Sequence, residues 1–147
     1  MNDEFLNRLV GSWSLTGKMG STELRQKVEA RWVIQSHFVE VHCLEEKLSS
    51  RDQNLYEAIY MIGHDSQSGE YSMHLFDTFG AGYARTVGVG TRQDNSIEFL
   101  FPYPNGLFSN TFTWHSTTDE WKMLLRQKDE TDKWKVFAIK SLSREEI

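Results

Sequence analysis

The stretch Ile62–Gly82, "IGHDSQSGEYSMHLFDTFGAG", decides the fold. It contains the end of an apolar run, a polar turn over "DSQSG", a second largely apolar run, and a glycine-rich turn that follows Asp77. Aspartate, serine and glycine are residues that tight reversals of the chain favour. The stretch therefore predicts the two antiparallel strands of a β-hairpin, with Asp77 at a strand end.

The same pattern continues in both directions along the chain. Short runs that alternate between apolar and polar residues are separated by the turn signals "RQDNS", "PYPNG", "STTD" and "DETD". These runs predict an all-β, up-and-down antiparallel β-barrel of about ten strands. The only prolines, Pro102 and Pro104, share one turn, which indicates that most strands are paired on both sides, as in a closed barrel. No linker or repeat interrupts the pattern, so residues 1–147 are predicted to form a single domain.

The N-terminal segment Met1–Val10 has helical rather than strand periodicity. Its apolar residues Phe5, Leu6 and Leu9 share one face at helical spacing, and Asn2 or Asp3 is a suitable N-cap. We therefore expect a short amphipathic helix that closes one end of the barrel.

Composition and charge exclude several classes of partner. The net charge is −5, and no segment combines clustered lysines and arginines with aromatic residues, which disfavours binding to nucleic acids or anionic membranes. Cys43 is the only cysteine, which rules out an internal disulfide and a multi-cysteine zinc site. Because the N-terminal segment is acidic and no run is long enough to span a membrane, we expect no signal peptide and a cytoplasmic protein.

The turns also predict which residues face the barrel interior. The predicted register places Met61 opposite Met73, Glu57 opposite Asp77, and Val89 opposite Phe99. Every second residue of a strand points to the same face of the sheet, so the apolar positions lie together on one face. The apolar residues predicted to face inward are Ile59, Met61, Met73, Leu75, Val87, Val89, Ile97, Phe99 and Phe101.

Four polar residues, Glu57, Asp77, Tyr83 and Arg85, fall on the same predicted inward side. A buried carboxylate needs a partner, and Arg85 and Tyr83 are able to supply one. This arrangement suits either a polar anchor for a ligand or a structural ion pair near the barrel mouth. The residues predicted to bind a ligand are Glu57, Asp77, Tyr83, Arg85, Met61, Met73, Leu75 and Phe99.

A shift of the register by one residue gives the alternative prediction. It would turn Tyr56, Tyr60, His74 and Phe76 into the lumen wall. Without the shift, the same four residues form an external aromatic patch, which suggests a homodimer contact.

The segment "LVGSWSLTG" resembles the opening of lipocalin-type (calycin) barrels. Gly11-x-Trp13 heads the first strand there, and the resemblance implies that Trp13 packs across the closed end, covered by a basic side chain from the last strand, Lys140 or Arg144. The segment from Tyr56 to Gly82 is similar to the central part of the DUF1579 family, a bacterial family of unknown function. The residues that match its pattern are Gly63, Asp65, Tyr71, Asp77, Gly80 and Gly82, whereas His64 and Leu75 depart from it. The resemblance implies a lipocalin-like barrel and no established activity.

Signals for catalysis and for a cofactor are weak. His37 and His42 point to opposite sides of a strand, and Cys43 is expected to be a buried, inert thiol. Some barrels of this shape resemble haem-binding nitrobindins, but no histidine follows His115 near the C-terminus. We predict no metal and no cofactor, and a haem site is a minor alternative. An enzyme that uses Glu57 and Asp77 as an acid and base pair is a further minor alternative.

The function predicted from the sequence is the binding of a small, largely apolar or amphipathic molecule in the barrel lumen, with a polar anchor. The charged segment Glu45–Asn54 is interpreted as a portal to the lumen or as a solvated turn. The alternative function is a non-catalytic interaction barrel that forms a homodimer.

Overall fold

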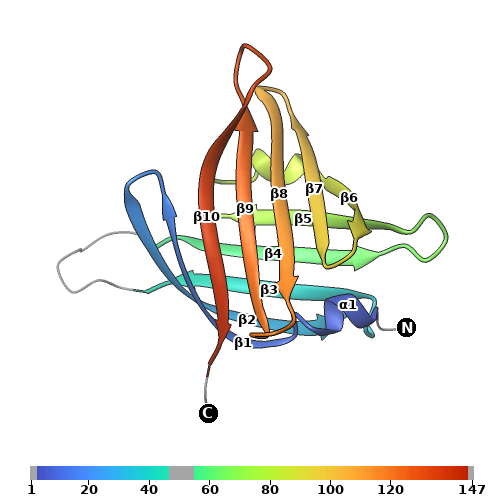
Figure 1. The fold of residues 1–147 in the computed structure, drawn as a ribbon. Helices are drawn as coiled ribbons and strands as arrows, with labels where there is room; N and C mark the ends of the chain where they lie inside the picture. The colour runs from blue at the N-terminus through green and yellow to red at the C-terminus, as the bar shows by residue number, and fades with distance from the viewer. Residues whose placement is uncertain (1–2, 47–54, 146–147) are drawn as a thin grey trace.

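The computed structural model of the chain describes residues 3–46 and 55–145, which form a closed antiparallel barrel (Figure 1). Each strand pairs with its neighbours in the sequence, and the first strand pairs with the last, as the alternating pattern predicted. The strands are β1 (Gly11–Met19), β2 (Thr22–Val33), β3 (Phe38–Glu45), β4 (Glu57–His64), β5 (Glu70–Asp77), β6 (Gly88–Gln93), β7 (Ser96–Tyr103), β8 (Gly106–His115), β9 (Glu120–Lys128) and β10 (Trp134–Arg144).

Among the described residues, two short helices accompany the strands: α1 (Glu4–Asn7) and the 3₁₀ helix η1 (Tyr83–Arg85). The Asp3 side chain caps α1 by accepting a hydrogen bond of 2.9 Å from the backbone N–H of Leu6. Phe5, Leu6 and Leu9 are buried against the end of the barrel, where the Phe5 ring contacts Trp121 edge-on. The predicted closing helix is confirmed, although it is shorter than the segment Met1–Val10. None of the described helices is long and apolar enough to cross a membrane.

Trp13 packs beside this helix at the closed end. It is fully buried, and its indole Nε1 donates a hydrogen bond of 2.7 Å to the backbone oxygen of Leu9. The guanidinium carbon of Arg144 lies 4.2 Å from the centroid of the Trp13 ring, and its nitrogens donate to the backbone oxygens of Val10 and Arg8. Of the two predicted covering residues, the structure therefore selects Arg144.

The hairpin between β4 and β5 has a different register from the predicted one. Ala58 pairs with Asp77, and Ile62 pairs with Met73. The reason is the length of the turn: the backbone N–H of Asp65 donates to the oxygen of Glu70, which leaves residues 66–69 as a loop with an even number of residues. The prediction assumed an odd number, and each one-residue shift turns a strand over.

This register shift turns over β4 and leaves β5 as predicted. Ala58, Tyr60 and Ile62 are buried in the interior, whereas Glu57, Ile59 and Met61 lie on the outer face. Met73 is buried, and Leu75 and Asp77 lie on the same inward side of β5.

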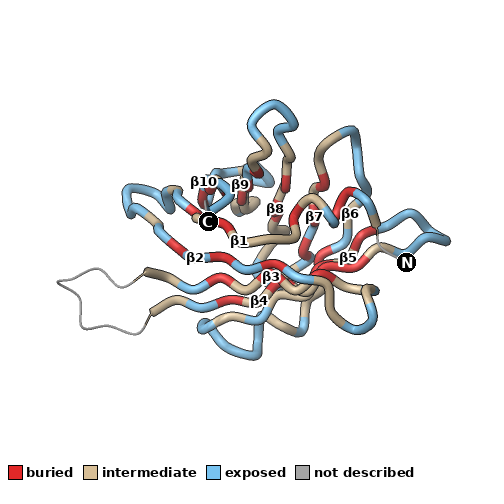
Figure 2. The backbone as a smooth tube through the Cα atoms, turned by 90° about the horizontal axis from the view of Figure 1, so that it is seen from below, coloured by how far each residue is buried: buried red, intermediate tan, exposed pale blue. Residues whose placement is uncertain are grey.

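The strands that follow β5 agree with the prediction only in part. Ile97, Phe99 and Phe101 of β7 are buried, as predicted. Val89 is 39% exposed on the outer face because its neighbour Gly88 occupies the inward position, against the Phe101 ring. Val87 precedes β6 and is half-buried. Buried and exposed positions alternate along the strands all the way round the barrel (Figure 2).

Candidate ligand-binding cavity

The barrel encloses a cavity of about 420 Å³ at the end opposite α1. Its lining comes from the ends of strands farthest from the helix, such as Met19 of β1, Glu45 of β3 and Tyr103 of β7. The other half of the lumen is filled by large buried side chains, among them Trp13, Trp121 and Phe112. One half of the barrel is thus a packed core and the other half is hollow.

Aromatic rings form much of the cavity wall. The rings of Phe101 and Tyr103 stack with their centroids 5.6 Å apart, and Tyr83 meets Tyr103 edge-on at 5.7 Å. Phe108 contacts both Phe101 and Tyr103. Burial raises the pKa of Tyr103 to about 12, so its hydroxyl is protonated at neutral pH. The wall is largely apolar, with a few polar atoms at its surface.

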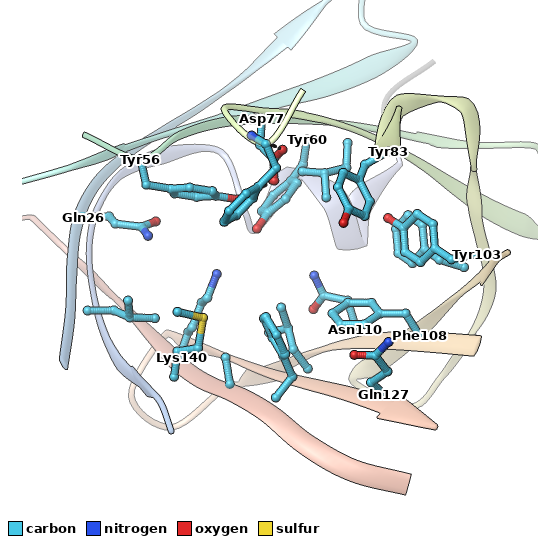
Figure 3. A pocket seen from close by; sticks show the side chains of 18 of the residues that line it. Gln26, Tyr56, Tyr60, Asp77, Tyr83, Tyr103, Phe108, Asn110, Gln127 and Lys140 are labelled. Atoms are coloured by element: carbon cyan, nitrogen blue, oxygen red, sulfur yellow. Dashed lines mark hydrogen bonds between the residues drawn. The ribbon is translucent and has the colours of Figure 1, made fainter. Parts of the chain in front are cut away.

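Lys140 is the unexpected member of the lining. It belongs to β10, where it alternates with the buried residues Ala138 and Leu142, and only 6% of it is exposed. Its amine points into the cavity (Figure 3), and it makes no salt bridge with the carboxylates of residues 3–46 and 55–145. Burial lowers the pKa of Lys140, against an opposing effect of Cys43 and Asp77.

Two amide side chains beside the cavity carry unpartnered acceptors. The side-chain oxygens of Gln26 and Asn110 are buried and have no hydrogen-bond partner among the described residues. Leaving a buried acceptor without a donor costs about 1–3 kcal/mol. Gln26 and Asn110 lie on either side of Lys140 along the cavity wall in Figure 3. The described residues therefore leave two buried acceptors beside the cavity without a donor.

Asp77 and two tyrosines form the polar part of the opposite wall. Asp77 accepts a hydrogen bond of 3.0 Å from the Tyr56 hydroxyl and another of 3.0 Å from the backbone N–H of Phe79. The Tyr60 hydroxyl points into the cavity (Figure 3), and burial raises the pKa of Tyr60 well above its usual range. Tyr60 is therefore a hydrogen-bond donor in the cavity over the whole physiological pH range.

The residues predicted to bind a ligand separate into three groups. Leu75, Asp77 and Tyr83 line the cavity. Met73 and Phe99 face inward but are fully buried and are not part of the cavity lining. The three residues that lie outside the lumen are Glu57, Met61 and Arg85.

Each outward placement has a physical cause. Glu57 and Met61 are on the outer face because of the register shift, and Glu57 pairs there with His42. Arg85 is exposed because residues 83–85 form η1 rather than a strand, so the expected alternation does not apply. Glu57 and Asp77 consequently lie on opposite sides of the barrel wall and do not form an acid and base pair.

The predicted external aromatic patch is not assembled either. Tyr56 and Tyr60 line the cavity, whereas Phe76 is 46% exposed on the outer face. Both predictions placed these four residues on the same face, either all outside or all in the lumen. The observed register changes the face of β4 alone, so His74 and Phe76 of β5 remain on the outer face. The homodimer stays a prediction, but this surface no longer supports it.

Sequence reasoning missed Lys140, Gln26 and Asn110 as lumen residues, and it placed Tyr56 and Tyr60 there only in the register alternative. The signal for Lys140 was its place in the series Ala138, Lys140, Leu142, in which the other two positions are apolar. Gln26 occupies a similar place between Leu24 and Val28.

The predicted portal begins at the mouth of the cavity. Glu45 lines the cavity and accepts a hydrogen bond from the backbone N–H of Tyr56, while residues 47–54 of the predicted portal lie outside the described residues.

Within the described ranges no cluster of three histidine, cysteine, aspartate or glutamate side chains is suited to a metal ion. None of the five histidines lines the cavity, so its walls offer no imidazole to a haem iron.

Comparison with known proteins supports the architecture. No family model matches the chain, and no curated protein does. The crystal structure of Rv2717c from M. tuberculosis is similar, with a TM-score of 0.67 and 14% sequence identity over 99% of this chain and 100% of the other. That likeness shows the fold alone. Membership of the DUF1579 family remains a prediction.

Replacement of Lys140 by methionine tests whether the buried amine destabilises the fold. We expect the free energy of unfolding to rise by about 1–3 kcal/mol at neutral pH, because methionine fills a similar volume without a buried charge. The pKa of Lys140 is lowered in the folded state, so the unfolded chain binds more protons between that pKa and the ordinary value of 10.5. Wild-type stability therefore rises with pH across this window, and the gain from the substitution shrinks toward pH 10.5.

Urea denaturation of both proteins at several pH values measures this gain. Lys135→Met is the matched control, because Lys135 lies on the same strand with 73% of its side chain exposed. We expect a change within about 0.5 kcal/mol for the control. A loss of stability in Lys140→Met at neutral pH would contradict the account.

Proposed function

We propose that the protein binds a small, largely apolar molecule in the hollow half of its barrel and holds the molecule's polar end by hydrogen-bond donors. The observation that carries the proposal is the cavity of about 420 Å³ with the buried Lys140 amine in its wall, where no carboxylate of residues 3–46 and 55–145 makes a salt bridge with it. Ligand pockets in proteins typically enclose about 300–1,000 Å³, with apolar walls and a few convergent polar groups.

The hydrogen-bond donors in the lining favour a ligand end that accepts hydrogen bonds. Lys140 and Tyr60 both offer donors to the cavity. The aromatic wall formed by Phe101, Tyr103 and Phe108 suits the apolar body of the ligand. A molecule with an oxygen at one end and a hydrocarbon body satisfies both parts of the lining.

A titration with the neutral apolar dye N-phenylnaphthylamine tests the proposal. We expect saturable fluorescence enhancement with the wild-type protein. Ala138→Phe places a ring in the cavity from β10 and should weaken dye binding about tenfold or more, a loss of at least about 1.4 kcal/mol.

The control variant is Ile139→Phe, which adds a ring at the neighbouring outward position of the same strand. We expect it to bind the dye with wild-type affinity. Absence of saturable binding to the wild-type protein would refute the proposal. So would equal effects of the two variants, since they would place the dye outside the barrel.

A further inference from the structure

Lys140 differs from the other lysines of the chain in its surroundings. Of the lysines that the structure describes, it alone is buried, and the cavity it faces has largely apolar walls. Its amine has neither a carboxylate within salt-bridge distance nor a hydrogen-bond partner among the residues described. An amine held in this way is accessible only to a molecule that enters the cavity.

We infer that Lys140 forms a reversible imine with an aldehyde group at the polar end of the ligand. This inference rests on the proposed function, because the aldehyde has to enter the hollow half of the barrel. It adds a covalent step to non-covalent binding and assigns the ligand to a chemical class, the apolar aldehydes.

The chemistry needs no reactant besides the aldehyde. The lone pair of Nζ forms a bond to the carbonyl carbon, and the carbonyl electron pair moves to oxygen, which takes a proton from the nitrogen. The resulting carbinolamine loses its hydroxyl group from carbon and the remaining amine proton from nitrogen as one water molecule. A C=N bond remains, and addition of water reverses the sequence.

The reaction requires the neutral amine, and burial favours that form. A lysine in an apolar site loses its proton more readily, because the charged ammonium is poorly solvated there. The pKa of Lys140 is accordingly lowered. The other buried nucleophile, Cys43, does not line the cavity, and burial raises the pKa of its thiol to about 11.

The opposite wall carries groups that suit each stage of the reaction. β5 lies five strands from β10 in the ring of ten, so Asp77 faces the cavity from the side opposite Lys140. Its charge already acts on Lys140 in the free protein, and it would favour a protonated imine in the same way from across the cavity. The Tyr60 hydroxyl is a donor for the carbonyl oxygen (Figure 3).

Reductive trapping with octanal tests the inference. The wild-type protein is incubated with octanal and sodium cyanoborohydride at neutral pH, and the modified lysines are located by peptide mass mapping. We expect Lys140 to be labelled at least about tenfold faster than any other lysine, with a mass gain equal to octanal less one oxygen atom. Excess octanol, which fits the same cavity but cannot form an imine, should slow the labelling of Lys140 alone.

Two variants complete the experiment. Lys140→Met should lose the fast labelling, and Lys135→Met should keep it, because the Lys135 side chain is 73% exposed at the start of the same strand. Since the map is made on the wild-type chain, the identity of the labelled residue does not depend on the folding of either variant.

The outcomes separate the inference from the proposed function. If octanol displaces N-phenylnaphthylamine from the wild-type protein but octanal labels Lys140 no faster than the exposed lysines, the imine is excluded and non-covalent binding stands. If the protein binds neither the dye nor octanol and Lys140 is unlabelled, both are overturned.

Discussion

Replacing Trp13 by alanine is expected to lower the free energy of unfolding by about 3–5 kcal/mol. Trp13 is fully buried at the junction between α1 and the barrel, where its indole N–H donates to Leu9 and Arg144 covers its ring. The substitution leaves a cavity, an unpartnered backbone oxygen and a guanidinium without its aromatic neighbour. Because α1 seals the packed end of the lumen, we expect it to detach in the variant before the strands separate.

Chemical denaturation followed by far-ultraviolet circular dichroism measures this loss without relying on tryptophan fluorescence. Trp134→Ala is the matched control, since Trp134 is half-buried and also lies beneath cations, with Arg126 at 4.8 Å and Lys128 at 5.3 Å from its ring. The control should cost only about 1 kcal/mol. Equal losses in the two variants would show that Trp13 has no special part in closing the barrel.

Gly17→Val is expected to destabilise the protein by at least about 3 kcal/mol, the upper part of the range for overpacked sites. A Cβ at Gly17 would collide with the backbone oxygen of Ile139 and lie 2.8 Å from the Cα of Lys140. Backbone atoms cannot rotate away as a side chain does, so β1 and β10 would have to separate. These are the strands whose pairing closes the barrel. Since the contact involves Lys140 itself, dye binding in the cavity should weaken as well.

Thermal and urea denaturation of Gly17→Val, alongside Gly82→Ala, tests this prediction. A Cβ at Gly82 meets nothing within 4 Å, and the backbone there has an ordinary φ of −60°. That control should change stability by no more than about 0.5 kcal/mol. A stable Gly17→Val with wild-type dye affinity would mean that the closing pair tolerates a wider spacing than the structure has.

The fold was predictable because the information that specifies it is local. Alternation and turn residues predicted the strands, and Asp3 and Phe5 marked the helix that closes the barrel. The register of β4 against β5 was not predictable in the same way. It depends on how the side chain of Asp65 and the positive φ of Gly69 shape the turn, and the sequence of this turn is compatible with either an odd or an even number of loop residues. A difference of one residue between the predicted and the observed length of this turn places Glu57 and Met61 on the outer face and not in the site.

The candidate site was harder to predict than the fold. Arg85 was placed by extending strand alternation through a segment that forms η1. Lys140 was overlooked as a lumen residue because periodicity arguments treat lysine as a marker of solvent, and a buried lysine is rare in soluble proteins. The proposed function depends largely on the departure from the hydrophobic pattern at this one position of β10.

The unequal filling of the two halves of the lumen has an evolutionary consequence. Side chains near α1, such as Phe112 and Trp121, fill the packed half of the lumen, whereas those at the far end, such as Phe108 and Gln127, line the cavity. Under the proposed function, ligand selectivity can therefore change at the far end while the packed half keeps the fold, and a protein engineer has the same freedom.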